Sequence, residues 1–161
     1  MATLTAMRYL LAVFVVVLAA SAAPTAGAQS FDRYLTAGGT LSLRDGVGSA
    51  RVMAQGGVLG KLDRGRVVIR DFPDRGGTDI NVWGADWTRV IDSRATLYGG
   101  TDLRFRALGG AWRVRIKGRG IDVSAAGRGA VTLRGAGGTF SLDGGSYRDW
   151  PDEVTRFEYG D

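Results

Sequence analysis

The stretch that decides the fold is "LRFRALGGAWRVRIKGRGIDV", residues 103 to 123. Apolar residues occupy every second position on both sides of a Gly-Gly pair. A period of two is typical of a β-strand, because successive side chains point to opposite faces. We expect Gly109 and Gly110 to form a two-residue hairpin loop. In that register the apolar residues lie opposite one another in three pairs: Ala107 with Trp112, Phe105 with Val114, and Leu103 with Ile116.

The same register collects positive charge on the other face of the predicted hairpin. The stretch contains six basic residues and one acid, and the pairing sets Arg106 opposite Arg113 and Arg104 opposite Arg115. Like charges that lie directly opposite destabilise a sheet by a few tenths of a kcal/mol to about 1 kcal/mol per pair. A register shift that keeps the apolar residues together moves by two positions and still sets bases against bases. The hydrophobic pattern therefore forces the basic residues onto one face.

A second predicted turn at "KGRG", residues 117 to 120, brings Asp122 beside Arg115, and the following strand brings it beside Arg134. One carboxylate then serves two guanidinium groups. The other acids are concentrated between residues 71 and 102 and from residue 143 onward. Three outcomes follow: an acidic segment covers and neutralises the basic face, the face is open to an anionic ligand, or it is solvated without a partner. The candidate anion-binding residues are Arg104, Arg106, Arg113, Arg115, Lys117 and Arg134.

Short apolar alternations with glycine-containing turns between them continue along most of the chain, at intervals of about nine residues. This spacing predicts an all-β protein, with an antiparallel β-sandwich or barrel-like meander of about ten to twelve short strands. The phrase "GGT" recurs at Gly38, Gly76, Gly99 and Gly137, but its unequal intervals do not fit a rigid repeat. A short β-solenoid is the alternative architecture.

The N-terminus has the layout of a secretory signal peptide. Arg8 is the only charged residue in positions 1 to 28, an apolar run follows it, and small residues end the segment at Ala28. We expect cleavage before Gln29, with cleavage after Ala22 as the alternative, leaving a single all-β domain at residues 29–161 without a transmembrane segment. The expected location is secreted or periplasmic, in the cell envelope.

The composition excludes several chemistries. The chain contains no histidine and no cysteine, which rules out Ser-His-Asp and Cys-His catalysis, the usual zinc ligand sets and disulfide bonds. We expect no enzymatic activity, no cofactor and no metal. Two-carboxylate glycoside hydrolysis remains open on residue types alone, because four carboxylates lie near one another in sequence: Asp79, Asp86, Asp92 and Asp102.

Two tryptophans, Trp83 and Trp87 in "VWGADW", could stack on a sugar. Packing in a core or turn is the more ordinary role of such a pair. Single-strand nucleic-acid binders present aromatic residues on the charged face, whereas Phe105 and Trp112 fall on the predicted apolar face here. The pattern therefore disfavours nucleic acid.

The function expected from the sequence is a non-enzymatic structural or binding module of the bacterial cell envelope or exterior. Its partner is not identified by any motif, and the basic face favours an anionic envelope polymer or lipid headgroups. Without Arg8 of the leader, the 20 remaining bases and 16 acids give a formal charge of +4 (20 minus 16). The alternative is a carbohydrate-binding β domain or, more rarely, a two-carboxylate glycoside hydrolase.

Overall fold

The computed structural model describes residues 38–72 and 79–160. Within these ranges the protein is all-β, as predicted, and its six strands belong to one antiparallel sheet. The expected leader, residues 1–28, lies outside the described residues. In the two described ranges, no helix is long and apolar enough to cross a membrane.

The strands differ greatly in length. Two are very long: β1 spans Gly39–Asp71 and β4 spans Ala95–Leu142. The short strands are β2 (Asp79–Trp83), β3 (Trp87–Asp92), β5 (Arg148–Asp149) and β6 (Thr155–Tyr159). The structure therefore has six strands where the sequence predicted ten to twelve, because β1 and β4 remain paired through the bends where separate turns were expected.

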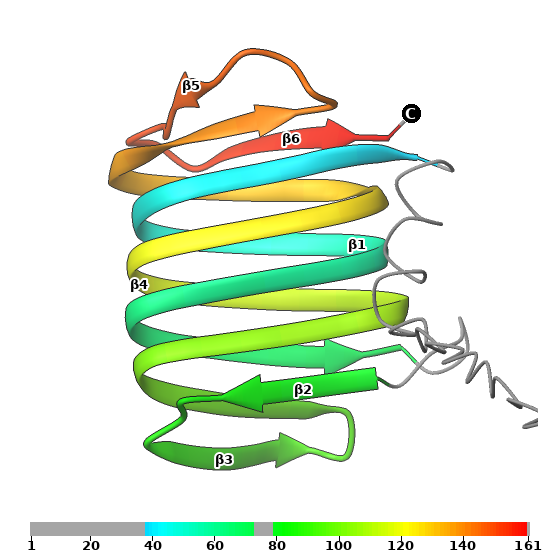
Figure 1. Cartoon of the computed structure of the whole chain (residues 1–161), viewed down its shortest axis with the longest axis vertical. Helices are drawn as coiled ribbons and strands as arrows, with labels where there is room; N and C mark the ends of the chain where they lie inside the picture. The colour runs from blue at the N-terminus through cyan, green and yellow to red at the C-terminus, as the bar shows by residue number, and fades with distance from the viewer. Residues whose placement is uncertain (1–37, 73–78, 161) are drawn as a thin grey trace, which may run out of the picture.

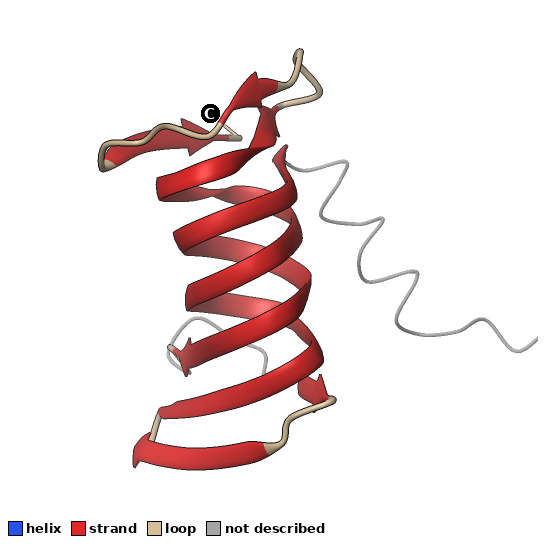
Figure 2. Ribbon diagram, turned by 90° about the vertical axis from the view of Figure 1, so that its left-hand side faces the viewer, coloured by secondary structure: helices blue, strands red, loops and turns tan. Residues whose placement is uncertain are grey.

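The two long strands pair with each other along both of their edges. Ala50 of β1 lies opposite Ile116 and also opposite Leu133 of β4, and most of β1 likewise has two partners 17 or 18 residues apart. A strand can pair twice with one partner only if both wind around a common centre. Figures 1 and 2 show this winding as stacked turns, with the short strands at the two ends.

Each turn of the winding contributes one segment to either side of the molecule, which gives two faces. Face 1 contains, in order of pairing, β6, residues 128–134 of β4, 49–55 of β1, 111–117 of β4, 66–70 of β1, 95–99 of β4, and β3. Face 2 contains β5, residues 139–142 of β4, 40–44 of β1, 121–126 of β4, 58–62 of β1, 103–108 of β4, and β2. The sheet does not close, because β2 and β3 end it on one side and β5 and β6 on the other.

Glycines occupy the bends between the faces and lie opposite other glycines. Gly48 pairs with Gly118 and Gly135, and Gly56 pairs with Gly110 and Gly127. Gly127 has a φ of +118°, a conformation that other residues rarely adopt, and a Cβ there would overlap the carbonyl oxygen of Gln55. At these glycine positions the backbones of neighbouring turns can therefore approach one another closely.

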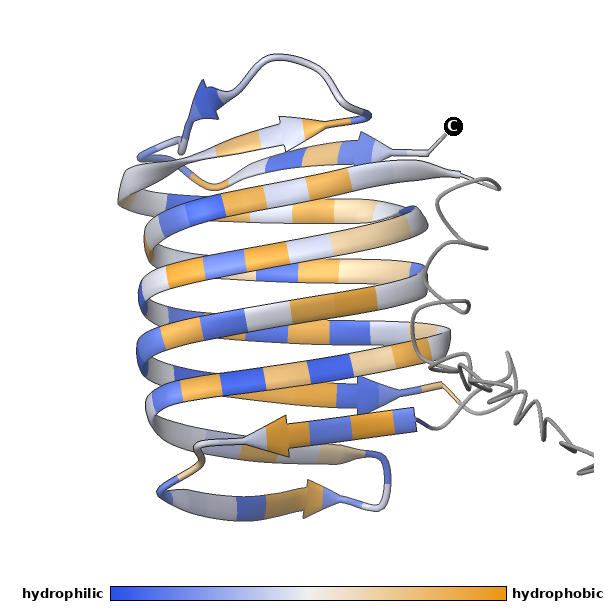
Figure 3. Cartoon of the chain, in the orientation of Figure 1, coloured by the Kyte–Doolittle hydropathy of each residue, from blue (hydrophilic) through white to orange (hydrophobic). Residues whose placement is uncertain are grey.

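The core lies between the two faces and is filled by every second residue of the long strands. Figure 3 shows the resulting alternation of hydrophobic and hydrophilic positions along the ribbon. The Trp112 indole donates a hydrogen bond of 3.1 Å from Nε1 to the carbonyl oxygen of Gly56. The predicted apolar face is confirmed, because its members are all buried: Leu103, Phe105, Ala107, Trp112, Val114, Ile116, Ile121 and Val123.

The predicted hairpin at Gly109 and Gly110 is wrong. β4 continues without interruption through both glycine pairs of the opening stretch, and its partner is β1. Arg106 lies opposite Leu59 and Asn81, not Arg113. The physical reason is that a glycine pair between two apolar alternations suits a bend around a corner as well as a reversal of the chain.

The pairings predicted for Arg104 and Asp122 are wrong for the same reason. Arg104 lies opposite Lys61 and Trp83 instead of Arg115, and Asp122 lies opposite Lys61. The predicted contacts of Asp122 with Arg115 and Arg134 are therefore not formed. Its carboxylate instead pairs with the Lys61 ammonium at 3.0 Å.

Candidate anion-binding face

Side chains that point outward from face 1 form columns, in which each residue lies directly opposite the next across neighbouring strands. The first column runs Trp87, Gly99, Arg66, Lys117, Ser49, Arg134. The second runs Arg89, Leu97, Val68, Arg115, Arg51, Thr132, Arg156. The third runs Asp92, Ala95, Arg70, Arg113, Met53, Ala130, Glu158. Neighbouring strands are about 4.8 Å apart, so the columns form a closely spaced grid in which basic residues alternate with aliphatic, hydroxyl and acidic ones.

Two arginine pairs lie directly opposite one another in this grid: Arg51 with Arg115, and Arg70 with Arg113. Each pair joins β1 to β4. The pKa of the Arg115 guanidinium is lowered from its ordinary value, first by partial burial and then by the charges of Arg51, Arg113 and Arg70. Like charges are thus held together by the strand register, as the sequence predicted, although the partners differ.

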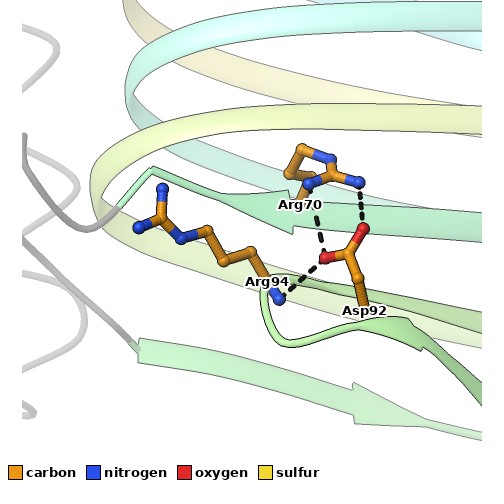
Figure 4. Close-up of polar contacts among 3 residues, drawn as sticks. All are labelled: Arg70, Asp92 and Arg94. Atoms are coloured by element: carbon orange, nitrogen blue, oxygen red, sulfur yellow. Dashed lines mark hydrogen bonds and ion pairs between the residues drawn. The ribbon is translucent and has the colours of Figure 1, made fainter.

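Ion pairs on face 1 involve its outermost strands. The Asp92 carboxylate of β3 accepts hydrogen bonds from the Arg70 guanidinium and, at 2.9 Å, from the backbone N–H of Arg94 (Figure 4). These contacts lower the pKa of Asp92, the backbone N–H of Arg94 having the largest effect. At the other end, Arg156 pairs with Glu158 of the same strand at 3.1 Å.

The centre of face 1 has uncompensated positive charge. Among the described residues, Arg51, Arg113 and Arg115 form no ion pair, and neither do Lys117 and Arg134. Of the three outcomes expected from the sequence, neutralisation by the protein's own acids therefore applies at the edges of this face. The middle of the face shows no such neutralisation by the described residues.

A depression of about 270 Å³ lies in the middle of this charge. Three arginines line it, Arg51, Arg115 and Arg134, together with Ser49 and Thr132. Guanidinium groups bind carboxylate and phosphate oxygens through paired N–H donors. The Ser49 hydroxyl donates to the carbonyl oxygen of Arg134 at 3.4 Å, whereas the Thr132 hydroxyl could donate to a bound anion. Val154 forms an apolar border on one side. The arrangement suits an oxyanion attached to a larger molecule.

The six predicted anion-binding residues do not share one face. Arg113, Arg115, Lys117 and Arg134 lie on face 1, whereas Arg104 and Arg106 lie on face 2. On face 2 the positive charge is more nearly balanced, since Arg106 pairs with Asp79 at 3.2 Å and Lys61 pairs with Asp122.

The sequence reasoning missed the arginines that β1 contributes to face 1, namely Arg51, Arg66 and Arg70. Each alternates with buried neighbours, as in "RVVIR" at residues 66 to 70. That alternation predicts an outward arginine, but only the long-range pairing places it beside the arginines of β4.

The two candidate sugar-stacking residues also lie on different faces. Trp83 ends β2 on face 2 opposite Arg104, and Trp87 begins β3 on face 1 opposite Gly99. Their exposed fractions are 51% and 48%. They therefore do not form one platform, but each presents part of an indole ring to solvent.

The four carboxylates considered for glycoside hydrolysis lie in different parts of the structure and do not share one set of partners. Asp79 pairs with Arg106 on face 2, and Asp92 pairs with Arg70 on face 1. Asp86 accepts a hydrogen bond of 3.1 Å from the backbone N–H of Thr101. Asp102 has a φ of +53° next to this bend. This placement gives the carboxylates structural roles at the end of the winding.

No family model matches the sequence, and comparisons with curated proteins and with solved structures also found no match.

Proposed function

We propose that the protein is a non-enzymatic binding module of the bacterial cell envelope or exterior that holds an anionic polymer on face 1. The main support for this proposal is the direct pairing of Arg51 with Arg115 in the middle of face 1, where neither forms an ion pair with another described residue. Opposed arginines cost stability, and an anion between them turns that cost into binding energy. Export through the leader at residues 1–28 would bring the face into contact with envelope polymers.

The regular spacing of the cations supports a polymer over a single small anion. The second column places Arg115 and Arg51 on adjacent strands, and the neighbouring columns place Lys117 and Arg113 beside them along β4. A chain with repeated phosphate or carboxylate groups could occupy several of these positions at once. Multiple contacts raise the overall affinity well above that of each single contact.

For the architecture, we infer a short β-solenoid built from two antiparallel strands, in preference to a sandwich or a barrel. The support is the nearly constant offset of 17 or 18 residues between the two partners of residues along β1. A constant offset is the mark of a repeating turn.

The proposed function is tested by retention on an immobilised phosphate polymer. The parent protein should bind at low salt and elute as ionic strength rises, because salt screens exposed charges. The double variant Arg51→Thr/Arg115→Thr should elute at much lower salt.

The matched control, Arg44→Thr/Arg104→Thr, removes the same charge from face 2 and should elute close to the parent. Circular dichroism verifies that both variants are folded. Equal loss of retention in the two variants would show that net charge matters and face 1 does not. A parent that flows through at low salt would reject the proposal.

A further inference from the structure

Trp87 belongs to the same column as three cations that can bind an anion. Beyond Gly99, this column continues with Arg66, Lys117, Ser49 and Arg134. A Cβ built on Gly99 would overlap the indole of Trp87. The indole ring therefore packs directly over Gly99, in the space that a side chain there would fill. The ring remains half exposed. An aromatic surface therefore begins a line of cations on face 1.

We infer that the anionic polymer is an acidic polysaccharide, with a sugar ring on Trp87 and its acidic groups along the cations of the first column. This inference rests on the proposed function and adds the chemical class of the ligand. Sugar rings present C–H groups that pack on indole, and their carboxylate, sulfate or phosphate substituents suit Arg66 and Lys117. The two chemistries that the sequence suggested separately, anion binding and sugar stacking, thus meet in one column.

The length of the column agrees with an extended chain. Five interstrand steps separate Trp87 from Arg134, which correspond to about 24 Å at about 4.8 Å per step. At the far end, the depression beside Arg134 is also lined by Arg51, Arg115 and Thr132. A glycan of several residues would therefore contact an aromatic ring at one end. At the other end, its acidic group would contact several arginines.

The arrangement fits nucleic acid less well. Single-strand binders place successive bases on successive aromatic rings. Among the three described columns of face 1, Trp87 is the one aromatic residue, and the positions beyond it are basic, small or aliphatic. A single ring at the end of a row of cations provides stacking for one unit, not for each unit of the chain.

The tryptophans of the chain make a sharp experiment available. Trp112 and Trp150 are buried, whereas Trp83 and Trp87 are half exposed on opposite faces. Trp83→Ala therefore leaves Trp87 as the exposed indole, and Trp87→Ala leaves Trp83. Acrylamide quenching of fluorescence then reports separately on each face.

The probes are oligogalacturonate, chondroitin sulfate, a phosphodiester-linked glycan and, as a polyanion without sugar, inorganic polyphosphate. At least one acidic glycan should protect the Trp83→Ala protein from quenching and leave the Trp87→Ala protein unprotected. Trp87→Ala should weaken binding of that glycan about tenfold, the factor that corresponds to about 1.4 kcal/mol. Trp83→Ala should bind it as the parent does, and polyphosphate affinity should be the same in both variants. Methyl-esterified oligogalacturonate, which lacks charge, should not bind.

The outcomes separate this inference from the proposed function. Binding of polyphosphate together with glycan affinities that Trp87→Ala leaves unchanged would overturn the glycan inference and leave the anion-binding face standing. Tighter binding of a single-stranded oligonucleotide than of any acidic glycan, with protection of Trp87, would assign the face to nucleic acid. Failure of polyphosphate and of all the glycans to bind at low salt would overturn both proposals.

Discussion

At the scale of single residues, the corner glycines have the most demanding positions. Gly127 has a positive φ, and the backbone of Gln55 lies so close to it that there is no space for a Cβ. We expect Gly127→Ala to lower the free energy of unfolding by about 1 to 3 kcal/mol, the usual cost of strain at such a position. Chemical denaturation monitored by circular dichroism measures it.

Gly137 is the matched control, because a Cβ there would meet no atom within 4 Å. Gly137→Ala should change the stability by no more than about 0.5 kcal/mol, as is usual for surface substitutions. Equal stability of the two variants would mean that the bends do not depend on the missing side chain.

Two core valines test the predicted inner surface. Val114 and Val123 belong to one core cluster and are fully buried. Truncation of either to alanine should cost about 1 to 3 kcal/mol through lost burial and the cavity left behind. Val90 of β3 is 70% exposed, and Val90→Ala should have little effect. Denaturation midpoints of the Val114 and Val123 variants equal to that of the parent protein would contradict the assignment of these residues to the core.

At the scale of strands, the opposed arginines predict that face 1 is electrostatically strained. Replacing Arg51 and Arg115 together with threonine should raise the free energy of unfolding by a few tenths of a kcal/mol to about 1 kcal/mol, because it removes a like-charge pair and introduces residues that suit strands. Thermal melts of parent and variant at low ionic strength measure the difference.

Added salt should narrow this difference, since it screens the repulsion in the parent. The comparison variant is Arg70→Thr, which removes a guanidinium that lies opposite Arg113 but is paired with Asp92. It should be neutral or slightly destabilising, because exposed ion pairs contribute about 0 to 1 kcal/mol. A loss of stability in the Arg51 and Arg115 double variant would mean that these arginines are held by contacts other than those described.

The sequence predicted the faces of the strands well and their partners poorly. Alternation is a local property, so Val114 and Val123 point inward whichever strand lies beside them. The partner of Arg113 depends on whether Gly109 and Gly110 reverse the chain or bend it around a corner, and both choices use the same residues. Pairing with β1, 43 to 60 residues away for Arg113, cannot be inferred from local pattern.

The candidate site was predictable to the same degree. Arg113, Arg115, Lys117 and Arg134 do share a basic face, because each lies on the outward side of β4. Arg104 and Arg106 belong to the other face because a corner lies between them and Arg113. Trp83 and Trp87 were separated in the same way by the bend at residues 84–86, which has no hydrophobic period to reveal it.

At the scale of the whole molecule, the candidate binding surface is built from the two long strands and not from loops. The positive charge of face 1 comes from alternating segments of β1 and β4, so its pattern follows from the winding itself. Acids lie mainly near the ends of the winding and in the tail, where Asp92 and Glu158 each pair with one arginine. A polymer laid on the middle of face 1 would meet cations from both strands.

The assignment of face 1 as the binding surface is tested most directly by arginine footprinting with phenylglyoxal. The reaction is run in the presence and absence of inorganic polyphosphate and read by mass spectrometry. The account predicts that polyphosphate protects Arg51, Arg115 and Arg134 of face 1, while Arg44 and Arg104 of face 2 react at the same rate with and without it. The protection should disappear as salt is raised. Protection of the face 2 arginines to the same extent, or no protection of Arg51 and Arg115 at low salt, would contradict the assignment of face 1 as the binding surface.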